Sequence, residues 1–202
     1  MKKRKTIIAA VVLLLVFVVG RAVAYFTDTE SVTNTFTIGN VDITLTEPNW
    51  DDADDNNNNV PDAAESKTPG QKIAKDPTIT NVGTNDAFVF AKVEAACTTD
   101  VSPAAPKEIF TYTVKSGWYL MTDNACSGGK TTKIYAYGSD TSMTRLAKDG
   151  KAVLFDEVIV NPEITGEEQG LTGNKDIVVT GYAIQADGID TVDPVEVWGN
   201  IS

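Results

Sequence analysis

The chain contains no histidine among its 202 residues, and this absence narrows its possible chemistry. Histidine is the commonest general base and the commonest zinc ligand in proteins. The sequence also lacks an HExxH motif, a Gly-x-Ser-x-Gly motif and a glycine-rich phosphate loop. A pair of carboxylates could still do acid–base work, but 28 acidic residues offer no way to single out two. We therefore predict that the protein is not an enzyme and needs no organic cofactor.

Positive charge is also scarce, with 17 Lys and Arg against 28 Asp and Glu and a net charge of −11. The first 24 residues hold five of the positive charges and no negative ones, so the chain without them carries −16. Nucleic acids and anionic membranes are bound by clustered Lys and Arg, so we predict no nucleic-acid partner. An acidic surface fits a soluble protein outside the cell or one that recruits divalent cations. Acidity for solubility alone is an equally good explanation.

The only long apolar run is Ile7–Val19, which follows a basic head of three lysines and Arg4. Its 13 residues fall short of the roughly 20 that a membrane-spanning helix needs, and Arg21 closes it. Ala22 and Ala24 then form the small-x-small pattern that precedes signal-peptidase cleavage. We predict that residues 1–24 are a signal peptide cut before Tyr25, which leaves a secreted protein without a stable membrane anchor.

Cysteine occurs only twice, as Cys97 and Cys126. An even number of cysteines in an exported chain favours a disulfide, which would close a loop of about 29 residues. Two free thiols are the alternative.

The apolar pattern is that of β-strands almost throughout the rest of the chain. Clusters of Gly, Asn, Asp and Pro separate these stretches, and no segment shows a sustained helical period. Many short strands between turns predict an all-β protein, a jelly-roll or β-sandwich of about nine strands, over residues 36–202. The stretches with strand pattern are 36–38, 41–45, 87–93, 109–114, 118–121, 134–137, 153–160, 177–186 and 195–198.

An insertion rich in Asn and Asp covers residues 51–65, and part of it fits a 12-residue calcium loop. Such loops offer oxygen ligands at positions 1, 3, 5, 7, 9 and 12. Position 6 usually needs glycine for its positive φ, and here it holds Asn59, the next most tolerant residue. The predicted ligands are Asp54, Asn56, Asn58, the carbonyl of Val60, Asp62 and Glu65.

A solvated linker is the competing interpretation of this insertion, because Asn- and Asp-rich composition produces spaced oxygens easily. Two neutral Asn ligands, the missing glycine and the lack of a preceding helix weaken the calcium hypothesis. The placement of Glu65 at the twelfth position favours it.

Three stretches give the chain a resemblance to the TasA/camelysin family of biofilm-matrix proteins. The first runs from Ala24 to Asp28 and from Asn34 to Ile43, where the sequence reads AYFTD and NTFTIGNVDI. The second comprises TPGQ at 68–71, KDP at 75–77 and NVGTNDAFV at 81–89, and VEVW at 195–198 is similar to the family's last strand. The resemblance implies a fibre-forming jelly-roll domain that is exported through a dedicated signal peptidase.

The resemblance further implies assembly by donor-strand complementation, in which the N-terminal arm of one subunit completes a sheet of the next. The arm would be residues 25–35, and its partner would be a second copy of the same chain. An ordinary frayed terminus is the alternative. The large apolar groups that could anchor the arm are Tyr25, Phe26, Val32 and Phe36.

The function expected from these features is that of a structural subunit of an extracellular fibre. A calcium-dependent adhesion or accessory module at the cell surface is the main alternative. A metallopeptidase, the activity attributed to camelysin, is a weaker one because no zinc motif is present.

N-terminal sequencing of the secreted protein tests the predicted signal peptide. We expect the mature chain to begin Tyr25-Phe26-Thr27-Asp28, because Ala24 ends the cleavage motif. A secreted chain that still carries Ile7–Val19 would contradict this prediction and would favour a membrane anchor.

Overall fold

A computed structural model describes residues 40–50, 53–58, 61–98, 105–164 and 175–201. All of these belong to one unit of the chain, Gly39–Ser202. The predicted signal peptide, its cleavage site and the N-terminal arm lie outside the described residues.

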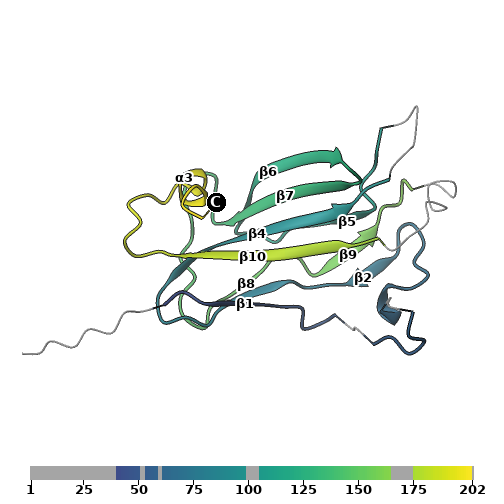
Figure 1. Ribbon diagram of the computed structural model, residues 1–202, viewed down its shortest axis with the longest axis horizontal. Helices are drawn as coiled ribbons and strands as arrows, with labels where there is room; N and C mark the ends of the chain where they lie inside the picture. Colours follow the sequence, from purple (N-terminus) through teal and green to yellow (C-terminus); the bar gives the residue numbers. More distant parts are fainter. Residues whose placement is uncertain (1–39, 51–52, 59–60, 99–104, 165–174, 202) are drawn as a thin grey trace, which may run out of the picture. The chain divides into compact units, whose positions relative to one another are not determined.

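Ten β-strands and two short helices make up the described part of the chain (Figure 1). Every strand pairing is antiparallel, which confirms the prediction of an all-β fold. The strands are β1 (Ile43–Thr46), β2 (Lys72–Ala74), β3 (Thr78–Asn81), β4 (Ala87–Ala96), β5 (Phe110–Tyr112), β6 (Trp118–Ser127), β7 (Lys130–Tyr137), β8 (Lys151–Val153), β9 (Glu157–Val160) and β10 (Ile177–Gln185).

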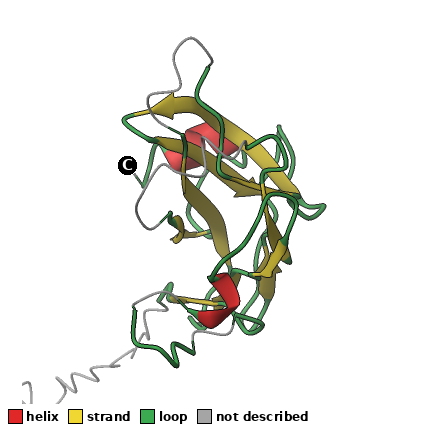
Figure 2. Ribbon diagram, turned by 90° about the vertical axis from the view of Figure 1, so that its right-hand side faces the viewer, coloured by secondary structure: helices red, strands yellow, loops and turns green. Residues whose placement is uncertain are grey.

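Three sheets form two layers around the main core. The four-stranded sheet has the order β10-β4-β7-β6, and the two three-stranded sheets have the orders β1-β3-β8 and β2-β9-β5. The main core contains Val89 and Val93 from the first sheet, Ile79 from the second and Val158 from the third, each at most 1% exposed. The four-stranded sheet therefore faces the two smaller sheets across a sandwich core, as Figure 2 shows from the side.

Strand β4 is the centre of the four-stranded sheet, and its two faces pack against different partners. Odd-numbered residues such as Val89 and Ala91 enter the main core. The even-numbered Phe88 and Phe90 enter a second cluster on the outer face, together with Val197. The dense run AFVFA is thus buried on both sides, and this explains why it lacks the polar alternation of an exposed strand.

The VEVW stretch near the C-terminus is a helix, so its prediction as a strand was wrong. Helix α3 spans Pro194–Trp198. The Asp193 side chain accepts hydrogen bonds from the N–H groups of Val195 and Glu196, and Pro194 occupies the first turn. An Asp-Pro pair is a helix start signal, which here outweighs the alternating pattern. Among the described residues, no helix is long and apolar enough to cross a membrane.

The stretch 153–160 is two strands in different sheets rather than the single strand that its pattern predicted. β8 pairs with β3, whereas β9 pairs with β2 and β5. Between them Leu154 and Phe155 are both buried, at 1% and 0% exposed, because the chain crosses from one sheet to the other. The strands β2 and β3 were missed, since Pro77 and its neighbours interrupt a very short pattern.

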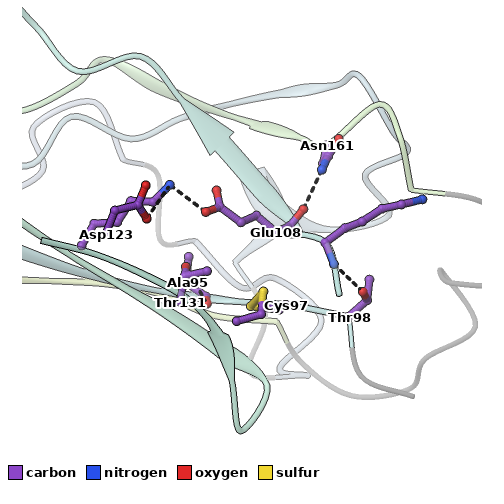
Figure 3. Close-up of a disulfide and its surroundings, with 10 residues drawn as sticks. Ala95, Cys97, Thr98, Glu108, Asp123, Thr131 and Asn161 are labelled. Atoms are coloured by element: carbon purple, nitrogen blue, oxygen red, sulfur yellow. Dashed lines mark hydrogen bonds and ion pairs between the residues drawn. A yellow bond between two sulfur atoms is a disulfide. The ribbon is translucent and has the colours of Figure 1, made fainter. Parts of the chain in front are cut away.

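Cys97 and Cys126 form a disulfide with a Cα–Cα distance of 6.1 Å. Figure 3 shows Cys97 at the end of the strand that carries Ala95, with Glu108 nearby. The backbone N–H of Cys97 donates to the carbonyl of Gly129, in the turn between β6 and β7. The disulfide therefore closes the end of the four-stranded sheet across this turn.

An ion pair lies close to the disulfide and links the two layers. The Lys133 amine is 2.7 Å from the Glu108 carboxylate and 3.9 Å from that of Asp123 (Figure 3). Burial of the Lys133 amine lowers its pKa, but the hydrogen bond and the negative charge of Glu108 raise it, and the net effect is a raised pKa. Burial raises the pKa of Tyr112, whose hydroxyl lies 3.2 Å from that of Tyr135. The stabilisation from the Lys133–Glu108 pair is therefore complete at neutral pH, and at alkaline pH it is lost as the pH rises through the raised pKa of Lys133.

Replacement of both Cys97 and Cys126 by alanine is expected to lower the free energy of unfolding by about 3–4 kcal/mol, because the open chain gains loop entropy in the unfolded state. Urea unfolding of the two proteins without reductant measures the difference. As a control, dithiothreitol should shift the midpoint of the wild type and leave that of the double variant unchanged. Equal midpoints without reductant would contradict a stabilising disulfide.

Candidate functional site

Three carboxylates of the Asn- and Asp-rich insertion converge at the surface. One oxygen each of Asp54, Asp62 and Glu65 lies within 4.8 Å of the other two. The 3₁₀ helix η1 (Asp62–Ala64) brings Asp62 and Glu65 to the same side of the loop. The backbone N–H of Asp62 donates to the carbonyl of Ala53 at 2.7 Å, so the loop closes on itself.

The two predicted amide ligands point to the same place. Asn56 and Asn58 each donate an Nδ2–H to Oε1 of Glu65, at 2.5 and 2.8 Å. The amide nitrogen and oxygen are nearly the same size, so a half-turn of each amide would present Oδ1 to a cation beside Glu65. The loop thus brings together five of the six predicted ligand residues. The sixth, Val60, lies outside the described residues.

The predicted positive φ at position 6 cannot be compared directly, because Asn59 also lies outside the described residues. Asn57, two positions earlier, has a φ of 56°. Asn tolerates this left-handed conformation better than most residues, so the Asn-rich composition has a local structural use.

The chemistry of this cluster fits a hard cation. Every side chain in it offers oxygen, and calcium takes six to eight oxygens at 2.3–2.6 Å. Two oxygens bound to one calcium ion therefore lie at most about 5.2 Å apart, which accommodates the observed spacing. The set has no nitrogen or sulfur ligand of the kind that structural and catalytic zinc sites favour.

A second candidate site is the free edge of β10, which the sequence pattern did not identify as an edge. β10 pairs with β4 on one side, and among the described residues no strand pairs with its other side. The Ala96 N–H donates to the Asp176 carbonyl and the Ala186 N–H to the Asp86 carbonyl. In an antiparallel ladder, residues that bond to the partner strand alternate with residues whose backbone groups point away from it. The even-numbered residues of β10 therefore bond to β4, and the odd-numbered residues point their N–H and C=O groups to the free edge.

The side chains of the same odd-numbered residues face the main core but are incompletely covered. Val179 is only partly buried, whereas Val93, its partner across the ladder, is 1% exposed. Ile177 and Ala183 are likewise only partly buried. At β10, the described chain therefore leaves backbone groups without a hydrogen-bonded strand and apolar side chains only partly covered.

Strand β1 presents a second edge nearby, which no strand of the described part of the chain covers. Leu45 is 36% exposed, although its ladder partner Ile79 is 1% exposed. A Cβ atom built on Gly181 of β10 would lie 3.3 Å from Cδ1 of Ile43 and 3.3 Å from Cδ1 of Ile79. β1 and β10 thus lie close to each other, yet they belong to different sheets and share no ladder.

The opposite edge strand of the four-stranded sheet, β6, is irregular, whereas β10 is regular. β6 carries two register shifts, between Leu120 and Thr122 and between Asn124 and Ser127. Bulges and charges on an edge strand prevent further strands from adding. β10 has nine consecutive paired residues, no register shift, no proline and no charged residue. The uncharged sequence IVVTGYAIQ would suit a central strand equally well, so it carries no signal of an edge.

The remaining predicted site residues cannot be placed. The cleavage-site residues Ala22, Ala24 and Tyr25 and the arm residues Phe26, Val32 and Phe36 all lie outside the described residues.

Comparison with known proteins gives a family match. The family described as camelysin metallo-endopeptidase matches residues 1–175. No curated protein matches the chain. The matched region ends before β10 and α3, so the unprotected edge lies beyond it.

Calcium is expected to bind the loop weakly, with a Kd of about 10⁻⁴–10⁻³ M, because two of its ligands are neutral amides. Isothermal titration calorimetry of the whole chain with CaCl₂ measures this. Glu65→Gln should abolish the heat, since it removes a charged ligand. Asp55→Asn is the matched control, because it removes one charge from the same loop at a position outside the ligand pattern. Equal heats for the wild type and Glu65→Gln would contradict a calcium site here.

Proposed function

This chain belongs to the TasA/camelysin family, and from that premise we propose that it is a structural subunit of an extracellular biofilm fibre. In this proposal the subunit is secreted, loses its signal peptide and polymerises by donor-strand complementation. The partner of each subunit is a second copy of the same chain.

The observation that carries the proposal is the unprotected edge of β10. Its odd-numbered residues offer N–H and C=O groups to an added strand, and their side chains leave apolar surface for that strand to cover. Main-chain hydrogen bonds supply affinity in strand addition, and alternate side chains supply specificity. A nine-residue edge without bulge, proline or charge is one that monomeric proteins avoid.

The donor in this proposal is the N-terminal arm, residues 25–35 with the adjoining Phe36. Tyr25, Phe26, Val32 and Phe36 would be its apolar anchors. Processing would trigger assembly, because an arm tethered to the membrane by the signal peptide cannot reach another subunit.

The proposal includes no peptidase activity, although the family carries the description of a metallo-endopeptidase. The whole chain has no histidine to act as a zinc ligand or general base. The three converging carboxylates lie on a surface loop and offer oxygen only.

Calcium binding by the insertion is a second proposed function, favoured by the convergence of Asp54, Asp62 and Glu65. It fits a role in adhesion or in stiffening the subunit outside the cell, where calcium is plentiful. A calcium-dependent accessory module that stays monomeric is the alternative to the fibre subunit.

The fibre proposal predicts that Val179→Pro blocks assembly. Proline removes an N–H that points to the free edge, so the ladder with β4 keeps its hydrogen bonds while the added strand loses one. We expect a folded monomer by circular dichroism and no fibres by electron microscopy.

Val179→Ala is the matched control for this substitution. It removes the same side-chain packing but keeps the N–H group, so it should form fibres. Normal fibres from Val179→Pro would rule out β10 as the acceptor, and the absence of fibres from the processed wild type would rule out the fibre function itself.

A further inference from the structure

The C-terminal end of β1 is fixed to the rest of the domain by a partly buried polar cluster, which we call the β1 tether. It consists of Glu47, Asn49 and Trp50, just after β1, and of Lys75 and Asp76, between β2 and β3. The Lys75 amine lies 2.7 and 2.8 Å from the two carboxylate oxygens of Glu47. The same amine lies 4.9 Å from the centre of the Trp50 ring.

Asp76 completes the tether from the other side of the same turn. Its Oδ1 accepts a hydrogen bond from the Asn49 backbone N–H, and its Oδ2 accepts one from Asn49 Nδ2, each at 2.8 Å. Lys75 and Asp76 are 8% and 6% exposed. Charged side chains are rarely this buried unless they are paired, so the tether has a definite geometry.

β1 is a short strand at the edge of its sheet. It has only four residues, it pairs with β3 alone among the described residues, and three of its four residues are exposed. The N–H groups of Val82 and Gly83 hold its N-terminal end by donating to the Asp42 carbonyl, and the tether holds its C-terminal end. β3, by contrast, is also held by β8 on its other side. Loss of the tether would therefore release β1 selectively, since short edge strands with few buried contacts open first.

We infer that the β1 tether is the positioning device of the strand-acceptor site: it holds β1 beside β10, so that an incoming strand meets Leu45 and Ile43 as well as the β10 edge. This inference rests on the proposed fibre function. The odd-numbered Ile43 and Leu45 point their backbone groups away from β3, because the Val82 N–H donates to the Asp42 carbonyl and the ladder alternates from there. β1 therefore offers the added strand a second edge and the exposed apolar surface of Leu45.

The test uses the double variant Glu47→Gln/Lys75→Gln in freshly prepared monomer of the processed chain. Both charges are removed together, so no unpaired charge is left buried. Lys72→Gln/Glu157→Gln is the matched control: this lysine–glutamate pair, at 2.5 Å, joins neighbouring β2 to β9, and neither residue belongs to the tether. Lys75→Arg is the conservative variant that should restore the wild-type behaviour.

The first measurement is amide hydrogen exchange. We expect the β1 amides of Thr44 and Thr46, which bond to β3, to exchange about tenfold faster in the tether variant, while the amides of β4 and β7 keep their rates. The control pair and Lys75→Arg should match the wild type. Unchanged exchange in β1 would overturn the inference, because the tether would then not hold β1 in place. An equal loss of protection in β4 would also overturn it, because the tether would then stabilise the whole domain rather than β1.

The second measurement is binding of a synthetic peptide with the sequence 25–38 to the monomer, measured by surface plasmon resonance. We expect the Kd of the tether variant to be about tenfold higher than that of the wild type, mainly through a faster off-rate. Equal Kd values would overturn the inference and leave the fibre function intact. Failure of the wild type itself to bind the peptide would contradict the fibre function.

Discussion

The backbone hydrogen-bonding groups along the free edge of β10 are the constraint on which the proposed function depends. An edge strand presents a row of N–H and C=O groups that can bond to a further strand, and at this edge the described chain supplies no such strand. The side chains of the same odd-numbered residues pack against the main core but are only partly buried. The edge therefore lacks both hydrogen-bond partners for its backbone and a cover for its apolar side chains. A strand that added here would satisfy both needs at once, which is the physical basis of the proposed assembly.

The rest of the fold supports that edge. β4 holds β10 along nine residues and is itself buried on both faces by the main core and by helix α3. The disulfide and the Lys133–Glu108 pair secure the same sheet near one end. The β1 tether places a second, shorter edge beside β10. The bulged edge of β6 is unsuited to strand addition, so the proposed assembly would use the β10 side of the sheet.

The sequence alone predicted much of the fold, and its failures have local causes. The long strands β4 and β10 were recognised because each carries an apolar run over most of its length. VEVW was misassigned because four residues cannot distinguish a strand from one turn of helix, and the preceding Asp-Pro signal was given too little weight. β2 and β3 were missed because a strand of three or four residues carries too few alternations to be seen beside Pro77.

The candidate sites were predictable to different degrees. The calcium loop is local in sequence, so its ligand spacing follows from the order of the residues between Asp54 and Glu65. The acceptor edge could not be deduced this way, because an edge is defined by the absence of a neighbouring strand, and strand order depends on long-range pairing. The tether joins Glu47 to Lys75 across 28 residues, and only the packed chain shows that these charges meet.

Amide hydrogen exchange resolved along β10, in monomer and in fibre, tests the strand-acceptor edge most directly. The even-numbered amides of Val178, Thr180 and Tyr182 bond to β4 and should be protected in both states. The odd-numbered amides of Val179, Gly181 and Ala183 should exchange fast in the monomer and become protected in the fibre. Odd-numbered amides that are already protected in the monomer, or that stay fast in the fibre, would contradict donor-strand assembly at this edge.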